Sequence, residues 1–158
     1  MGHMKLGHSV EGDMLKIEVG GQIDEDANFS SVELNSEKIH LDLAGIEAIN
    51  SCGIREWIKW IKTASESAEI VYSNCPKVIV DQINMVAGFL PSNAHVESFY
   101  VPYYCDESGS EKMILFKRNK DFNASGVNPP EDVKCDESGE EMEMDVIEAK
   151  YFKFLKGA

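Results

Sequence analysis

Ile39-His40-Leu41-Asp42-Leu43-Ala44-Gly45-Ile46-Glu47-Ala48-Ile49-Asn50-Ser51-Cys52-Gly53-Ile54 is the stretch of this chain that decides the fold. Its first apolar residues alternate with polar ones, which is the period of a β-strand with one buried face. Residues 50–53 are turn and capping types, and beyond them the apolar spacing becomes helical. The stretch therefore predicts a strand, a short loop and a helix N-terminus, where free N–H groups favour an anion, a phosphorylated side chain or a partner's carboxylate.

The predicted helix runs from about residue 53 to 65 and has two different sides. Its apolar side carries Ile54, Trp57, Ile58, Ile61 and Ala64, with Trp60 at the flank. Arg55, Lys59 and Lys62 fall together on the other side. That basic face has two interpretations: a solvated helix surface, or a docking face beside the loop of residues 50–53.

Strand and helix patterns alternate from residue 14 to 99. Strands are predicted at 14–19, 38–43 and 68–72, and an acidic start signal at 24–26 predicts a short helix reaching residue 32. A helix is predicted at about 76–87 and a further strand at 96–104. This order predicts an α/β fold with a small mixed, mostly parallel sheet flanked by helices.

The domain organisation is predicted from the breaks in this pattern. Residues 1–13 form a leader, in which 1–3 are expected to be a cloning remnant, and residues 14–102 form the α/β domain. Residues 103–144 form a hairpin appendage. Residues 145–158 form a C-terminal helix that packs on the domain, because Asp145 and Glu148 have the spacing of a capping box.

Composition narrows the function classes. The chain has 158 residues, of which 43% are hydrophobic, as expected for a globular domain. A net charge of -13 argues against a nucleic-acid partner, because phosphate binding depends on Lys and Arg. No apolar run is long enough for membrane insertion and no signal peptide is visible. Four cysteines without dense spacing predict a cytoplasmic location.

The central stretch resembles the STAS domain, a family that includes anti-sigma factor antagonists. The resemblance is carried by Gly21-Gln22-Ile23-Asp24, by the strand and Ala-Gly-Ile turn of residues 39–46, and by the Ser-x-Gly-Ile helix entry within 49–54. It covers about residues 14–100. It implies a small sheet flanked by helices and a regulatory role that depends on protein partners.

In that family the loop usually reads Asp-Ser-Ser-Gly or Asp-Ser-Thr-Gly, and a hydroxyl in it is phosphorylated by a kinase that is also the anti-sigma factor. Here Asn50 stands in place of Asp, Ser51 matches the first Ser, Cys52 replaces the second hydroxyl, and Gly53 matches. If the acceptor is the second hydroxyl, it is missing. If it is the first, Ser51 is the modification site. The resemblance thus implies a retained docking loop whose phosphate switch is weakened or lost.

Two residues of the loop have alternative interpretations. Ser51 is either a phosphate acceptor or a simple N-cap of the helix. Cys52, at a helix N-terminus, is either a reactive thiolate or a small, inert, partly buried thiol.

A pentapeptide occurs twice, as residues 105–109 and 135–139, both reading Cys-Asp-Glu-Ser-Gly. The pair resembles a zinc ribbon in which Ser108 and Ser138 replace the second cysteine of each turn. Two thiolates and two hydroxyls make a poor structural zinc site, so we expect no cofactor, and zinc at Cys105 and Cys135 stays an alternative. Turns held by hydrogen bonds and a Cys105–Cys135 disulfide are the other two interpretations.

The function predicted from the sequence is a non-enzymatic, bacterial regulatory module of the anti-sigma factor antagonist type. It would dock an anti-sigma factor or kinase-like partner through a surface made of Asn50, Ser51, Cys52, Gly53, Arg55, Lys59 and Lys62. The alternative is a redox- or metal-responsive protein that uses Cys105 and Cys135. An enzyme is disfavoured because the sequence has no recognisable catalytic set, phosphate-binding glycine loop or cluster of metal-ligating histidines.

Overall fold

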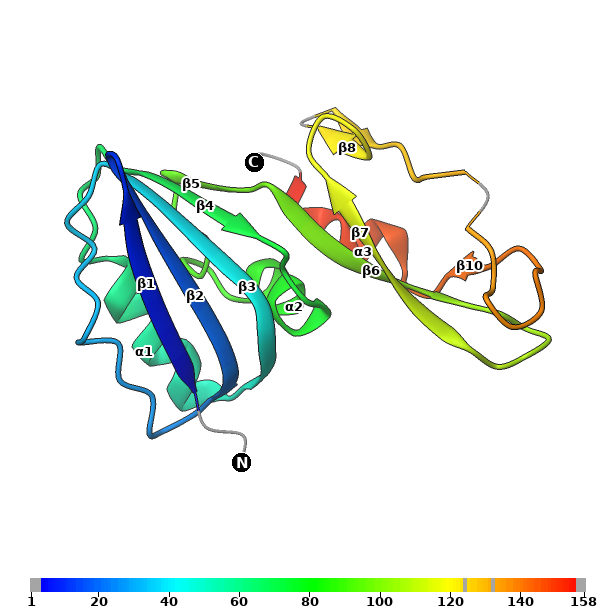
Figure 1. The fold of residues 1–158 in the computed structure, drawn as a ribbon, viewed down its shortest axis with the longest axis horizontal. Coiled ribbons are helices and arrows are strands. Elements are labelled where there is room, and N and C mark those ends of the chain that lie inside the picture. Colours follow the sequence, from blue (N-terminus) through cyan, green and yellow to red (C-terminus); the bar gives the residue numbers. More distant parts are fainter. Residues whose placement is uncertain (1–3, 124, 132, 156–158) are drawn as a thin grey trace.

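The computed structural model of the chain describes residues 4–123, 125–131 and 133–155 (Figure 1). A mixed α/β fold is present, which confirms the predicted class at this level. The expected remnant at residues 1–3 and the last residues of the expected C-terminal helix, 156–158, lie outside the described residues.

The main sheet has five strands in the order β1-β2-β3-β4-β5. These are β1 (Lys5–Glu11), β2 (Met14–Ile23), β3 (Lys38–Ile49), β4 (Glu69–Ser73) and β5 (Ala94–Val96). β1 is antiparallel to β2, and the other neighbours are parallel. In β2 and β3 the apolar residues of the alternating pattern are buried, as the periodicity predicts.

Strand β1 corrects the expectation that residues 1–13 are only a leader. It pairs with β2 along its whole length, through a turn at Gly12, whose φ is 61°. Its residues are mostly exposed because it is an edge strand, so they carry no alternation of buried and exposed positions that a sequence pattern could reveal.

Two helices pack against the main sheet, α1 (Ser51–Ile61) and α2 (Lys77–Met85). The core between α1 and the sheet is aromatic. The Trp57 indole donates to the Tyr72 hydroxyl over 3.1 Å, and that hydroxyl donates to the carbonyl of Phe89 over 2.6 Å. Trp60, expected at the flank of the helix, is also buried, and its indole donates to the carbonyl of Val32.

The helix predicted at residues 24–32 is absent, and this segment is irregular. The carboxylate of Asp24 accepts the N–H of residue 26, and the Asn28 side chain accepts the N–H of Ser30. These local bonds compete with helical hydrogen bonding. Phe29 is nevertheless buried and stacks on Trp60 with ring centroids 4.4 Å apart, so the segment closes one end of the core.

The second part of the chain forms a three-stranded sheet in the order β10-β6-β7. Its strands are β6 (Ser98–Tyr104), β7 (Glu111–Lys117) and β10 (Glu143–Met144), and a small hairpin joins β8 (Phe122–Asn123) to β9 (Gly126–Val127). The strand predicted at 96–104 is therefore two strands in different sheets. Glu97 alone separates them; its N–H donates to Tyr72 of the main sheet and its carbonyl accepts from Arg118.

Up to Leu155, the last described residue, the C-terminal segment forms the short helix α3 (Glu148–Tyr151) and a 3₁₀ turn at Lys153–Leu155. Within the described residues the predicted helix over 145–158 is shorter than expected, and its capping box is wrong, because the N–H of Asp145 donates to the carbonyl of Pro102 and continues the β10–β6 pairing. The segment packs on α2 and on β6, where Phe99 lies among Tyr151, Phe152 and Phe154. Among the described residues, no helix combines the length and apolar character needed to cross a membrane.

Candidate functional site

The predicted docking loop lies where β2 and β3 end. β3 stops at Ile49, and the N–H of Asn50 donates to the carbonyl of Ile23, the last residue of β2, over 3.1 Å. The chain then enters α1 directly. Sites for ligands and partners in α/β folds form beyond the carboxyl ends of parallel strands, which is the position of this loop.

Asn50 is the N-cap of α1. Its Oδ1 accepts the N–H of Gly53 over 2.9 Å, and its Nδ2 donates to the Glu25 carboxylate over 3.1 Å. The interpretation of Ser51 as the cap is therefore wrong: Ser51 is the first residue of the helix and is exposed. Asn50 thus supplies the capping oxygen, and Ser51 remains available at the surface.

Gly53 fixes how closely α1 approaches the sheet. It is buried, and a Cβ at this position would lie 2.1 Å from the carbonyl oxygen of Ile23 and 2.9 Å from its Cγ2. Only glycine fits this contact. The neighbouring Cys52 is partly buried with a free thiol, which agrees with the position expected for an inert thiol.

The basic residues of α1 lie on its solvent side, as predicted. Arg55, Lys59 and Lys62 are exposed. Together with Ser51 they occupy positions i, i+4, i+8 and i+11 of one helix, which places all four within about 80° of the helix circumference. We call this row, from Ser51 to Lys62, the basic stripe. Lys59 pairs with Glu56 at 3.4 Å, whereas Arg55 and Lys62 form no ion pair within the described residues.

An acidic cluster borders the loop on its other side. Carboxylate oxygens of Asp24, Glu25 and Asp26 lie within 4.8 Å of one another, and Glu25 holds Asn50. In the sequence these residues indicate only a helix start, and their position beside the loop depends on contacts between distant parts of the chain. The loop is thus flanked by negative charge at 24–26 and by positive charge along α1.

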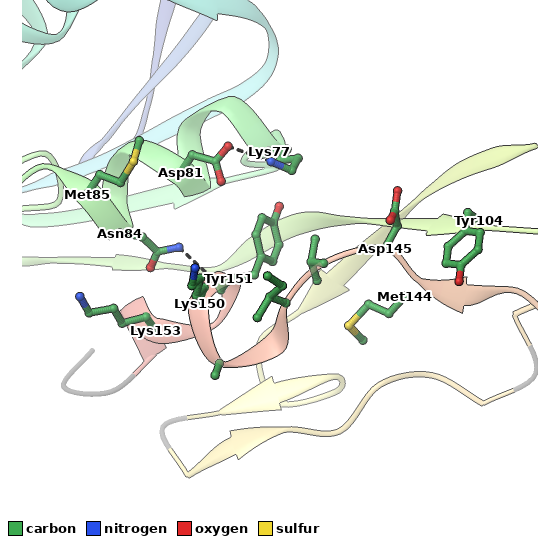
Figure 2. Close-up of a pocket in the computed structure, with 13 residues that line it drawn as sticks. Lys77, Asp81, Asn84, Met85, Tyr104, Met144, Asp145, Lys150, Tyr151 and Lys153 are labelled. Carbon is green, nitrogen blue, oxygen red and sulfur yellow. Dashed lines mark hydrogen bonds and ion pairs between the residues drawn. The ribbon is translucent and has the colours of Figure 1, made fainter.

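A groove lies away from this loop, between α2 and the C-terminal segment (Figure 2). Its volume is about 820 Å³, and its rim carries both charges, including Lys77 and Asp81, which pair at 3.0 Å. Asn84 closes its inner end by donating to the carbonyl of Tyr151 and accepting the N–H of Phe154, both over 2.9 Å. The sequence offered no signal for this groove, because its walls are distant in the chain.

The two pentapeptide turns face each other, as predicted. The thiol of Cys105 lies 3.4 Å from the Ser138 hydroxyl, and the thiol of Cys135 lies 3.3 Å from the Ser108 hydroxyl. Hydrogen bonds from the hydroxyls of Ser108 and Ser138 lower the pKa of Cys105, and those from the Ser108 hydroxyl and the backbone of Ser138 lower the pKa of Cys135 to about 6. Both cysteines are buried and free.

Two other groups with reactive side chains, Cys75 and His40, are held by the fold. Cys75 is fully buried, and burial raises the pKa of its thiol far above the ordinary value. His40 lies on β3 with its Nε2 at 2.7 Å from the Ser73 hydroxyl. These contacts give both residues a structural role.

The structure thus brings the predicted residues into two separate places. Asn50 and Ser51 are exposed next to the exposed side of α1, with Gly53 buried, whereas the turns of Cys105 and Cys135 meet beside the second sheet. No protein-family model matches this chain, and a comparison with curated proteins finds no match.

Proposed function

We propose that this protein is a non-enzymatic regulatory module of the STAS type, which captures an anti-sigma factor or kinase-like protein in the cytoplasm. The partner docks on the loop of residues 50–53 and on the basic stripe of α1. Two observations support the type: β2, β3, α1, β4 and α2 follow one another in the order that the resemblance implies, without the short helix expected between β2 and β3, and the loop joins β3 to α1.

The observation that carries the docking proposal is the basic stripe itself. Ser51, Arg55, Lys59 and Lys62 form one exposed row that begins at the N-terminus of α1. The exposed cations and the free N–H groups of the first turn both favour binding of a negatively charged group. In a chain with a net charge of -13 this is a local reversal of sign, which favours an acidic patch on the partner.

The geometry also supports partner binding that is not switched by phosphorylation of the loop. Cys52 replaces one hydroxyl of the family's loop, and the exposed Ser51 is the remaining hydroxyl. A phosphate on Ser51 would add about -1.5 to -2 charges. Arg55, one helical turn away, would neutralise part of that charge, and Glu25, held against Asn50, would repel it. Modification is therefore expected to change partner binding less than it does in a loop that carries two hydroxyls.

The test begins with affinity capture from the native cell and identification of the partner by mass spectrometry. The purified partner is then titrated with wild-type protein and with the double variant Arg55→Glu/Lys59→Glu. We expect the dissociation constant of the variant to rise by about tenfold or more, mainly through slower association, and the difference to shrink at high salt.

A matched control makes the same change in net charge, two cations to two carboxylates, at residues outside the basic stripe. Lys5 and Lys120 are exposed and lie outside α1, so Lys5→Glu/Lys120→Glu should bind as the wild type does. Circular dichroism and urea unfolding confirm that both variants are folded. Equal binding by the wild type and the stripe variant, or an equal loss in the control, would contradict docking through α1.

A further inference from the structure

The two pentapeptide turns have the same backbone conformation. In the first, the N–H of Cys105 donates to Ser110 and the N–H of Gly109 donates to Cys105, both over 2.9 Å. In the second, Cys135 and Gly139 make the equivalent bonds, also over 2.9 Å. The two glycines have φ of 71° and 72°. Such a turn points its cysteine sulfur and its serine hydroxyl toward the same side.

The turns face one another so that their four side chains form one cluster. We call Cys105, Ser108, Cys135 and Ser138 the thiol–hydroxyl cluster. Each sulfur contacts the hydroxyl of the opposite turn, at 3.4 Å and 3.3 Å. Backbone N–H groups of both turns also point at the sulfurs, those of residues 107 and 108 at Cys105 and those of 137 and 138 at Cys135. Both cysteines are at most 4% exposed, whereas Ser108 and Ser138 are exposed, so the sulfurs are shielded from bulk water and the hydroxyls are not.

The scaffold holds this cluster in place before any ligand arrives. The first turn joins β6 to β7, and the second leads into β10, which pairs with β6 at Tyr103 and Tyr104. Two further contacts tie the turns together: the Ser110 hydroxyl donates to Glu137 over 2.8 Å, and Lys112 pairs with Asp136 at 3.0 Å. A ligand therefore meets a formed site, which reduces the ordering cost of binding.

The donor set selects the kind of ion. Thiolate sulfur is a soft ligand that favours Cu(I), Zn(II) or iron–sulfur clusters. Within the described part of the chain, the only group of three or more His, Cys, Asp or Glu side chains close enough to share a metal is 24–26, so no carboxylate or imidazole joins the two sulfurs. Structural Zn(II) sites take four protein ligands and catalytic ones three with a water, whereas this cluster offers only two thiolates and two poorly binding neutral hydroxyls. Cu(I), a monovalent d10 ion, can instead be bound by two thiolates alone.

We propose that the thiol–hydroxyl cluster binds one Cu(I) ion between the sulfurs of Cys105 and Cys135. Binding forms two S–Cu bonds, each thiol that still carries its proton releases it to water, and the copper stays in the +1 state. The hydroxyls of Ser108 and Ser138 donate hydrogen bonds to the thiolates and disperse the single negative charge of the complex. This site is independent of the docking surface on α1.

The test uses the full chain, reduced and without oxygen, in competition with a chromophoric Cu(I) chelator. We expect the wild type to remove one equivalent of copper from the chelator. Cys105→Ser and Cys135→Ser should each weaken Cu(I) binding by roughly a hundredfold or more, because each removes one of only two strong ligands. Cys52→Ser removes a thiol outside the cluster and should bind Cu(I) as the wild type does.

X-ray absorption of the wild-type copper complex gives a readout that does not depend on the folding of variants, and it should show two sulfur neighbours. The same competition with Zn(II) and a zinc chelator completes the test, and zinc should bind more weakly than copper. Failure to take copper from the chelator, a sulfur count other than two, stronger binding of zinc, or an equal loss in Cys52→Ser would overturn the proposal.

Discussion

The carbonyl oxygen of Ile23 lies directly against Gly53, so closely that a Cβ on residue 53 would stand 2.1 Å from it. This contact sets the distance between the end of β2 and the first turn of α1, and with it the position of the whole docking loop.

Replacing Gly53 by Ala should destabilise the protein by about 1–3 kcal/mol, because the added methyl group meets backbone that cannot move aside. Urea unfolding followed by tryptophan fluorescence measures the change, since Trp57 and Trp60 are buried. Gly7→Ala is the matched control: nothing lies within 4 Å of a Cβ there. It should stay within about 0.5 kcal/mol of the wild type. Equal effects of the two substitutions would show that the close contact is not rigid.

Asn50 and Ser51 should differ in their effects on stability. Asn50→Ala removes the cap bond to Gly53 and the bond to Glu25, and should cost about 1 kcal/mol in the free energy of unfolding. Ser51→Ala should cost less than about 0.5 kcal/mol, since the exposed Ser51 is not the cap. If Ser51→Ala proves the more destabilising, the assignment of the cap is reversed.

Asn84 should hold the C-terminal segment to α2. Asn84→Ala leaves the carbonyl of Tyr151 and the N–H of Phe154 without their partner, at a cost of about 1–3 kcal/mol. Amide hydrogen exchange at residues 151–155 should accelerate in this variant. Gln82→Ala, a partly buried amide on the same helix, is the control and should leave that exchange unchanged. Unchanged exchange in Asn84→Ala would mean that aromatic packing alone holds the segment.

Tyr72 should make stability fall at alkaline pH. Burial raises the pKa of its hydroxyl far above the ordinary value of about 10, so the folded state keeps the proton that the unfolded state loses. Its contribution is complete below pH 10 and declines above it, by about 1.4 kcal/mol per pH unit. Urea unfolding at pH 9 and pH 11 should show a shallower decline in Tyr72→Phe than in the wild type. Equal declines would mean that Tyr72 ionises in the folded protein.

Ser108→Cys/Ser138→Cys should convert the thiol–hydroxyl cluster into a four-thiolate zinc site, because the two turns already point these side chains at one centre. Zinc affinity should rise by roughly a hundredfold or more over the wild type, as measured by chelator competition. Ser110→Cys/Ser138→Cys is a control in which one added thiol replaces a serine that instead bonds Glu137, and it should gain less. No gain in the first variant would mean that the turns are not in zinc-binding geometry.

The sequence predicted best where local periodicity and tertiary burial agree. The alternation of Ile39, Leu41 and Leu43 and the helical stripe around Trp57 both lead to buried faces, so the strand and the helix were predicted, although β3 continues through the expected turn to Ile49 and α1 spans 51–61 instead of about 53–65. The repeated pentapeptide likewise predicted two facing turns, because identical sequences in ribbon-like spacing imply a shared centre.

Other features could not be read from local patterns. β1 is an exposed edge strand whose only evidence is its pairing with β2. The helix expected after Asp24 does not form, because side chains of this segment hydrogen-bond to the nearby backbone instead. The bonds of Asn84 to the C-terminal segment join residues 67 and 70 positions apart, and nothing in the neighbourhood of Asn84 indicates them.

The passage of the chain through Glu97 has a consequence for folding. Its N–H is bonded to β4 and its carbonyl to the end of β7, and the adjoining Ser98 and Tyr100 bond to Cys75. Glu97 is the only residue between β5 and β6, and its hydrogen bonds hold it to both sheets. Unfolding of one sheet would therefore break contacts of the other. We therefore expect the two sheets to unfold together, and a chain cut at residue 102 to lose the β7 and C-terminal contacts that cover Phe99.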